Sequence, residues 1–338
     1  MRESGLQMDS YMKRPFDRTG KTLNRLWYYA SGALRHATPA VAFSRYREDI
    51  LRAVDSSNER EELLARANYY NKLAPDMTYL PSTPLDRIDR SKSRYFLDLQ
   101  EYLKYFPQSL RVDYLFGDVT WIPEVPALVK SRPIMGGNEN SVLLNLDKLR
   151  HFQVHRDTHV WSDKLPRVVW RGSLNNPLRA ALVERHRNSR FADVGHVGAV
   201  RDGIAPKPFL SPHDQLAYRY ILSIEGHDVA TNLKWVMASG SVCLMPKSRY
   251  ETWFMEGRLQ PGRHFIEVRD DFADLEEKID MLESTPGLAA EVVQNANRYV
   301  ATFRSGTMER LTSLLVLQKY FEATGQLPPS AYTARFFE

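Results

Sequence analysis

Two glycine-containing stretches in the second half of the chain carry residue types suited to holding a phosphate. Gly172 and Ser173 follow an apolar run, and a helical pattern then begins with Arg179 in its first turn. Gly226 likewise precedes a segment that predicts a helix with Lys234 near its start. The unpaired N–H groups of a helix N-terminus favour an anion. A cation in that turn opposes the helix dipole, and a phosphate between them would relieve the conflict.

Both stretches also fit one place in a fold. In an open parallel sheet, such turns gather at the carboxyl edge of the strands, where ligands bind. Two helix starts together with Arg171, Arg179 and Lys234 would suit a diphosphate. The chain contains no GxGxxG and no GxxxxGK[ST] fingerprint, so two ordinary helix starts with solvated cations remain the structural alternative.

Asp118 is the first candidate for a general base. It follows a strand-like run and Gly117, and the next cation after it along the chain is Lys130. We therefore expect partial burial to raise its pKa toward the range useful for proton transfer. A Gly-Asp pair is also a common turn, which is the structural alternative.

Other chemistries have less support. The secondary acid–base candidates, each equally compatible with a structural role, are Glu225, His227 and His264. The alternating set His155, Asp157 and His159 could ligate a metal from a strand, but a polar loop is the favoured interpretation, and the chain has no Asp-x-Asp pair. Cys243 lies in an apolar run and no GxSxG motif occurs, which disfavours acyl transfer.

Length and composition indicate a globular protein of two domains. The 338 residues are 43% hydrophobic and 26% charged, ordinary values for a soluble protein. A single cysteine excludes an internal disulfide and fits the cytosol. No segment approaches the roughly 20 apolar residues of a membrane span, and the N-terminus lacks a signal-peptide core. We therefore expect a cytoplasmic protein.

The net charge of +5 and the pI near 9.1 allow three kinds of partner: nucleic acid, an anionic membrane surface or a phosphorylated small molecule. The charge is spread along the chain in stretches of mixed sign, and no zinc-finger spacing or RNA-binding aromatic motif is present. Nucleic acid is therefore the weakest of the three, and we expect no nucleic-acid partner.

The elements that position these residues divide near residue 155. Before it, the sequence predicts an irregular arm over 1–25, helices over 23–73, a loop over 75–93, a helix over 94–106, and extended segments near 112–116 and 127–130. After it, strands alternate with helices, including one that Asp228 opens and Gly240 ends. This alternation predicts an α/β fold with a mostly parallel sheet covered on both faces.

Three blocks follow one another in the second half of the chain: WRGS with the following proline and Arg179, then YRYILSIEGHDVATNLKWVMASGSVCLMP, then TWFMEGRLQPGRHFIEVRDDFADLEE. In this order they resemble the family 90 glycosyltransferases, which include eukaryotic protein O-glucosyltransferases and bacterial lipopolysaccharide-modifying enzymes. Upstream, NYYNKL and GDVTWIPEVPALVKSRPI resemble the bacterial branch in particular. The resemblance covers roughly residues 65 to 285.

The resemblance implies a GT-B architecture, in which two Rossmann-like domains face a cleft. The implied division is an acceptor-side domain with a helical arm (1–155), a nucleotide-sugar domain (156–300) and a helical C-terminal segment (301–338). The implied activity is inverting, metal-independent transfer of a hexose or pentose from a UDP-sugar to a hydroxyl of a surface glycan such as lipopolysaccharide core. It needs no cofactor, and the acceptor would be met at the inner face of the cytoplasmic membrane.

Carried over by position, Ser173 and Arg179 match the diphosphate-contacting serine and arginine of the family, and Asp118 matches its catalytic base. Asn232 stands where eukaryotic members often have an arginine, so Lys234 or His264 would have to compensate. The resulting donor-binding candidates are Arg171, Gly172, Ser173, Arg179, Glu225, Gly226, Asn232, Lys234 and His264. The competing interpretation is a non-catalytic module that binds anionic glycan or lipid at the membrane surface.

Overall fold

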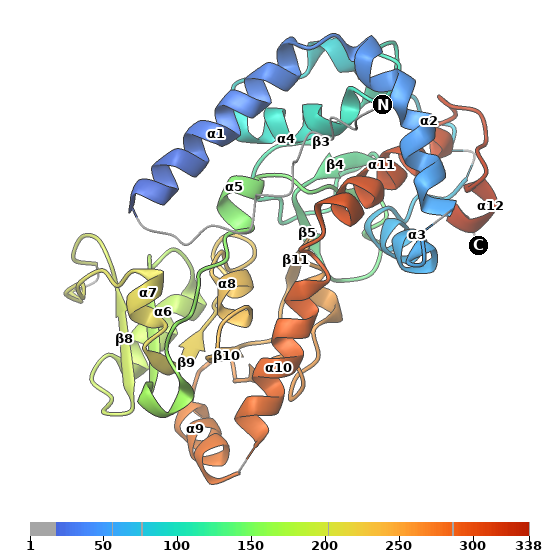
Figure 1. The fold of residues 1–338 in the computed structure, drawn as a ribbon. Helices are drawn as coiled ribbons and strands as arrows, with labels where there is room; N and C mark the ends of the chain where they lie inside the picture. The colour runs from blue at the N-terminus through green and yellow to red at the C-terminus, as the bar shows by residue number, and fades with distance from the viewer. Residues whose placement is uncertain (1–17, 56, 76, 202, 286, 338) are drawn as a thin grey trace.

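A computed structural model describes residues 18–337, apart from positions 56, 76, 202 and 286, and shows a mixed α/β fold with parallel sheets (Figure 1). The chain begins with three helices, α1 (Arg18–Ala37), α2 (Ala40–Asp55) and α3 (Arg60–Tyr70). The predicted irregular arm over 1–25 is therefore wrong for 18–25, while 1–17 lie outside the described residues. Contacts with another helix explain the early start of α1, because the Tyr28 hydroxyl donates to Asp98 Oδ1 at 2.9 Å.

The N-terminal half contains short strands and two further helices. The helices are α4 (Ser93–Leu103) and α5 (Lys148–His151), with a 3-10 turn η1 (Leu85–Arg87). The strands are β1 (Thr83–Pro84), β2 (Arg111–Val112), β3 (Tyr114–Leu115), β4 (Ala127–Val129), β5 (Ser131–Pro133) and β6 (Ser141–Leu143). β3, β4 and β6 form a parallel three-stranded sheet, and β1 pairs with β2 in an antiparallel ladder. The predicted extended segments near 112–116 and 127–130 are confirmed.

The second half is organised around a parallel five-stranded sheet of order β12-β10-β9-β7-β8. Its strands are β7 (Leu165–Gly172), β8 (Ala192–His196), β9 (Tyr218–Leu222), β10 (Val242–Met245) and β12 (Ile266–Glu267). The helices between and after them are α6 (Pro177–His186), α7 (Pro212–Gln215), α8 (Leu233–Met237), α9 (Leu275–Ser284) and α10 (Leu288–Ala301), with 3-10 turns η2 (Trp161–Asp163) and η3 (Glu256–Arg258).

Side chains alternate between the two faces of this sheet, as the period of two along a strand requires. Val168 and Trp170 of β7 pack with residues of α6 and α9 in one apolar cluster. Val169, between them, joins a second cluster that includes residues of α8 and of the C-terminal helix α11 (Gly306–Ala323). The expected sheet with both faces covered is therefore confirmed, and it explains why these strands read as continuous apolar runs.

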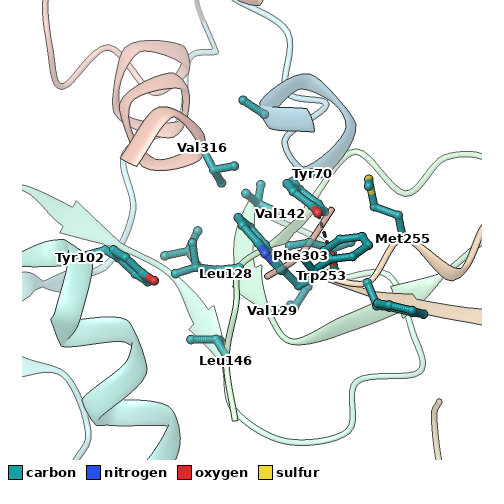
Figure 2. Packing of buried hydrophobic residues seen from close by; sticks show 14 of the residues in the cluster. Tyr70, Tyr102, Leu128, Val129, Val142, Leu146, Trp253, Met255, Phe303 and Val316 are labelled. Carbon is teal, nitrogen blue, oxygen red and sulfur yellow. Dashed lines mark hydrogen bonds between the residues drawn. The ribbon is translucent and has the colours of Figure 1, made fainter. Parts of the chain in front are cut away.

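The C-terminal helix α11 (Gly306–Ala323) returns to the N-terminal half, where it lies beside α3 (Figure 1). The last helix, α12 (Thr333–Phe336), also packs near α3, and β11 (Tyr250–Thr252) pairs with β5. Trp253, just after β11, stacks on Tyr70 of α3 with ring centroids 3.9 Å apart, and the Tyr70 hydroxyl donates to Trp253 O at 2.7 Å (Figure 2). The two halves therefore share one apolar core.

The helix expected to run from Asp228 to Gly240 is much shorter. α8 spans only Leu233–Met237, with Asn232 at its N-cap. Asp228 does not cap it, because its carboxylate lies 2.6 Å from Lys130 Nζ in the N-terminal half. The prediction was wrong here because an ion pair between distant parts of the chain replaces the local cap.

Candidate active site

The turn between β7 and α6 forms as the sequence predicts. Pro177 is the first residue of α6, and the Asn176 side chain accepts a hydrogen bond from Arg179 N at 3.0 Å. Asn176 is therefore the N-cap of α6. This cap satisfies one amide at the start of α6 and leaves the positive end of the helix facing the carboxyl edge of the sheet.

The turns that follow β7 and β9 lie side by side, because these two strands pair in parallel. Asn176 Nδ2 donates to Glu225 O at 2.6 Å and to Gly226 O at 2.8 Å. Arg179 donates from Nε to Glu225 O at 3.0 Å and from Nη2 to Ile224 O at 2.8 Å. Side chains from the start of α6 thus join the two candidate phosphate turns. We call this contact the Arg179 junction.

Arg179 places a cation at this junction without a neutralising acid. Its Nη1 donates to Asn175 Oδ1 at 3.0 Å, and its guanidinium lies 5.7 Å from the centre of the Trp170 ring. Within the described part of the chain, no carboxylate forms an ion pair with Arg179. Burial, and then the neighbouring charge of Arg150, lower its pKa to about 10. An anion bound here would remove this penalty.

Gly226 is needed at this junction for space. A Cβ on Gly226 would lie 3.2 Å from Arg179 Nη2, closer than most real contacts of that kind. Its own N–H donates to Asp228 O at 2.9 Å, so the second turn is closed on itself and does not lead directly into a helix. The first turn therefore supplies the helix start, and the second supplies the carbonyls that hold Arg179.

Asp118 lies at the mouth of a pocket of about 620 Å³, which we call the Asp118 pocket. Gly117, with φ of +128°, makes the turn that presents it. The same pocket is lined by Lys92, Arg94, Tyr95, Thr120 and His227. His227 belongs to the turn after β9, so the pocket joins the N-terminal half to the carboxyl edge of the main sheet.

The pKa expected for Asp118 was wrong in direction. Burial alone would raise it, but the hydrogen bond and charge of Lys130, with Arg150 and His227 adding to them, hold the pKa of Asp118 below its ordinary value. Lys130, buried at the end of β4, donates to Asp118 Oδ1 and also lies 2.6 Å from Asp228 Oδ2. Asp118 is therefore ionised at neutral pH and shares one ammonium group with a second carboxylate.

Arg150 connects the candidate base with the candidate phosphate turns. Its Nη1 lies 3.8 Å from Asp118 Oδ1, and its positive charge contributes to the lowered pKa of Arg179. The sequence reasoning missed Arg150 because it belongs to NSVLLNLDKLRHF, a short apolar segment whose pattern fits either a strand or a helix. It also missed Lys130, although a lysine ending the apolar run ALVK was a usable indication of a functional strand end.

Glu225 lies at the carboxyl end of β9 in a narrow, nearly filled space next to Leu178 and Ser223. Its Oε1 accepts from Arg249 N at 2.9 Å and Tyr250 N at 3.1 Å. Burial nevertheless raises its pKa to about 7, against the lowering effect of these two amides. Glu225 is thus a titratable group beside the Arg179 junction.

Three other donor-binding candidates have partners of their own. Arg171 points toward β8, where its Nη2 pairs with Asp193 Oδ1 at 2.9 Å. Lys234 is 1% exposed and pairs with Glu256 Oε1 at 2.7 Å. His264 accepts from Gln260 N through Nδ1 at 3.0 Å, in a turn that packs on α10. The structure does not bring these three to the Arg179 junction.

Asn232 and Ser173 stay near the junction. Asn232 Nδ2 donates to Leu222 O at 2.9 Å, which fastens α8 to the end of β9. Ser173 is exposed in the β7–α6 turn, 3.5 Å from Arg179 Nη1 through its Oγ. A Cβ on Gly172 would collide with the Trp170 ring at 2.5 Å, so glycine is required where β7 ends.

The alternating set near residue 157 is occupied by protein groups. Asp157 Oδ2 accepts from Lys164 Nζ at 2.7 Å and from Gly240 N at 2.9 Å, and His159 Nδ1 lies 3.3 Å from Asp157 Oδ1. Across the described residues, no group of three or more histidine, cysteine or acidic side chains is arranged to hold a metal ion.

Residues 142–321 match the model of glycosyl transferase family 90. Over 76% of its length the chain is also 48% identical to the O-glucosyltransferase LpsA of Dichelobacter nodosus, covering 81% of that protein. The chain belongs to glycosyltransferase family 90. The resemblance found in the sequence is therefore confirmed, and the protein is a glycosyltransferase.

More distant relatives of this family 90 glycosyltransferase are eukaryotic. Protein O-glucosyltransferase 2 of Danio rerio is 25% identical over 48% of the chain and 34% of the relative. Protein O-glucosyltransferase 1 of Rattus norvegicus is 22% identical over 41% of the chain and 38% of the relative. The chain thus spans little more than a third of these two proteins.

The range matched by the family model contains the Arg179 junction but not Asp118. The turn after β7, the turn after β9 and α8 all lie within 142–321. Asp118 precedes that range, so its candidacy in this glycosyltransferase rests on the pocket it lines and on its proximity to Arg150.

Proposed function

We propose that this glycosyltransferase moves a hexose or pentose from a UDP-sugar to a hydroxyl of a surface glycan such as lipopolysaccharide core, with inversion and without a metal ion. The observation that carries the proposal is the Arg179 junction. A cation with no carboxylate partner in the described structure lies at the start of α6, and Arg150 connects it to the carboxylate of Asp118. Such a junction suits a diphosphate next to a base.

The donor pyrophosphate would occupy the turn between β7 and α6. The helix start supplies a fixed partial positive charge, and Arg179 and Arg150 supply full charges on either side. Ser173 is exposed in the same turn and offers a hydroxyl donor. These groups would stabilise the charge that grows on the leaving diphosphate, which is the task a divalent cation performs in other transferases.

The transfer step would be a single displacement. Asp118 accepts the proton of the acceptor hydroxyl while that oxygen forms a bond to the anomeric carbon of the sugar. The bond from the anomeric carbon to the β-phosphate oxygen breaks at the same time, and UDP leaves with the electron pair. Because the acceptor attacks opposite the leaving group, the configuration at the anomeric carbon inverts.

Lys130 explains how Asp118 can be ionised before the step and protonated after it. Before the step, the ammonium group holds Asp118 as a carboxylate. When Asp118 takes the proton, Lys130 keeps its second partner, Asp228, at 2.6 Å. The buried cation is therefore never left without a carboxylate when Asp118 is protonated.

The arrangement of the sheets supports a GT-B interpretation. The three-stranded parallel sheet β3-β4-β6 carries Lys130 and leads to Asp118, and the five-stranded sheet leads to Arg179. The donor would bind to the second and the acceptor to the first. The name of the bacterial relative favours glucose as the transferred sugar and an oxygen acceptor.

We also propose that α1 contacts an anionic membrane surface. No helix in the described residues is long and apolar enough to cross a bilayer, but α1 exposes a stripe of large apolar side chains. The exposed members are Leu23, Leu26, Trp27 and Leu34, between 57% and 71% accessible. The helix has four lysines and arginines and no acidic residue, which complements anionic headgroups.

Two experiments test these proposals. Purified protein is incubated with UDP-glucose, UDP-galactose and UDP-xylose, with and without bacterial core oligosaccharide and in EDTA, and released UDP is measured. Turnover in EDTA supports the proposal, whereas turnover only after manganese is added contradicts the metal-free mechanism. For the membrane, Trp27→Ser should reduce sedimentation with phosphatidylglycerol vesicles. Phe209→Ser, at an equally exposed site in the other half, should not.

A further inference from the structure

A second pocket lies between the start of α1 and α5, and we call it the arginine pocket. It has a volume of about 540 Å³. Its polar lining consists of Asn24, Arg25, Tyr29, Arg94, Arg150 and Gln153. Among the described residues that line it none is acidic, and every polar side chain in the set carries a hydrogen-bond donor. This is the lining expected for an oxyanion.

The arginine pocket keeps an excess of positive charge. Arg94 Nη1 lies 3.3 Å and Arg150 Nη1 lies 4.0 Å from the carboxylate of Asp147, a buried residue behind them. Arg25 is exposed on α1 and rests 6.0 Å from the centre of the Tyr29 ring. No carboxylate of the described chain pairs with Arg25. Two carboxylates, of Asp147 and Asp118, therefore lie against three guanidinium groups, which leaves one positive charge in excess.

The arginine pocket opens beside the candidate base. Arg94 lines both this pocket and the Asp118 pocket. Arg150 lines the arginine pocket and lies 3.8 Å from Asp118 Oδ1. A group held in the arginine pocket is thus separated from Asp118 by little more than one side chain.

The lining residues assign the pocket to the acceptor side. All of them lie between residues 24 and 153, in α1, α4, α5 and the segment after α5 (Figure 1). The turns proposed for the donor diphosphate begin at Gly172 and Glu225, on the other sheet. A molecule that reaches both the arginine pocket and Asp118 therefore binds along the N-terminal half, which the proposed function assigns to the acceptor.

We infer that the arginine pocket binds a phosphate or carboxylate group of the acceptor, carried close to the hydroxyl that is glycosylated. This inference rests on the proposed function, because it names the class of acceptor for the same site. The planar guanidinium groups would bind such a group in a bidentate manner, and Asn24 and Gln153 would donate to its remaining oxygens. The anion would fix which hydroxyl of the acceptor lies next to Asp118.

The test compares acceptors and variants in one scheme. Core oligosaccharide is used intact, after removal of phosphate with aqueous hydrofluoric acid, and after reduction of its carboxyl groups. For wild-type protein, losing the relevant anion should raise the acceptor KM by about tenfold, the value of one charged hydrogen bond. The treatment that produces the rise identifies the anion as phosphate or carboxylate.

Arg25→Gln should raise the KM for the intact acceptor by about tenfold and leave kcat unchanged, and the anion-free acceptor should show no further loss. UDP affinity should also stay unchanged. The control is Arg87→Gln, which removes the same charge from an exposed site outside the pocket. Equal effects of Arg25→Gln on intact and anion-free acceptors, or equal effects of the two variants, would overturn the inference.

Failure of the proposed function is distinguishable from failure of this inference, because the wild-type protein would then turn over no UDP-sugar. Inorganic phosphate is then titrated into UDP-saturated protein by calorimetry. Weaker phosphate binding by Arg25→Gln than by Arg87→Gln supports the anion site even then, and identical binding by the two variants rejects it.

Discussion

The guanidinium of Arg179 packs against the α-carbon of Gly226, where a Cβ would lie only 3.2 Å from Nη2. Gly226→Ala should therefore push Arg179 by a few tenths of an ångström without straining the backbone. We expect UDP affinity to fall by about tenfold, or about 1.4 kcal/mol, with little loss of stability. Calorimetric titration with UDP checks this. Gly306→Ala, where a Cβ meets nothing within 4 Å, is the matched control and should bind UDP normally.

Asp118→Asn removes the proposed proton acceptor and keeps the shape of the side chain. We expect kcat to fall by about 10²- to 10⁴-fold, the usual contribution of general-base catalysis, while UDP still binds. Steady-state kinetics and calorimetry on the same preparation separate the two effects. Asp86→Asn, at an exposed site, should leave both unchanged. Retained turnover in Asp118→Asn would remove this residue from the role.

Substitutions of Lys130 and of Asp228 should affect the pH dependence of activity differently. Lys130→Met removes the cation that lowers the pKa of Asp118, so the acidic limb of kcat/KM should move to higher pH. Breaking the buried pair should also cost on the order of 3–5 kcal/mol of stability. Asp228→Asn leaves Asp118 as the remaining carboxylate partner of Lys130, so the acidic limb of kcat/KM should not move to higher pH. A shift of the acidic limb to higher pH in both variants would show that Lys130 does not control the pKa of Asp118.

Glu225 should make stability depend on pH. Burial raises its pKa from 4.5 to about 7 in the folded protein, so its protonated form is favoured by folding. Its stabilising contribution is complete below the unfolded pKa and is lost as the pH rises through 7. Glu225→Gln keeps a neutral group at every pH and retains an oxygen acceptor for the amides of Arg249 and Tyr250. It should exceed the wild type in stability at pH 8 by on the order of 3 kcal/mol and match it below pH 4.5.

Urea unfolding of both proteins across this range tests the prediction for Glu225. The difference between variant and wild type should grow steadily with pH. A difference independent of pH would mean that the pKa of Glu225 is the same in the folded and the unfolded protein.

Local patterns predicted the Arg179 junction well. Asn176 and Pro177 are residues that favour the first positions of a helix, and the apolar run from Val168 to Trp170 could only be a buried strand. Since alternating strands and helices give parallel pairing, the turns after β7 and β9 had to meet at one edge of the sheet. These features depend on short-range chemistry and on chain topology.

Interactions between distant parts of the chain could not be predicted in the same way. The approach of Lys130 to Asp118 and Asp228 reverses the expected pKa of Asp118 and shortens the helix that Asp228 was expected to open. Lys234 was expected to be free to bind a phosphate, but it forms an ion pair with Glu256, 22 positions later in the chain. Each error concerns a charge whose partner is set by the tertiary structure and not by neighbours in the sequence.

The most direct test of the account is calorimetric titration of UDP into wild-type protein, Arg179→Ala and Arg185→Ala, all in EDTA. Arg185 is an exposed cation on the same helix, so its loss controls for the change in charge. The account predicts that wild type and Arg185→Ala bind UDP alike without a metal, and that Arg179→Ala binds at least about tenfold more weakly. Equal affinity of all three proteins, or binding by the wild type only after manganese is added, would contradict it.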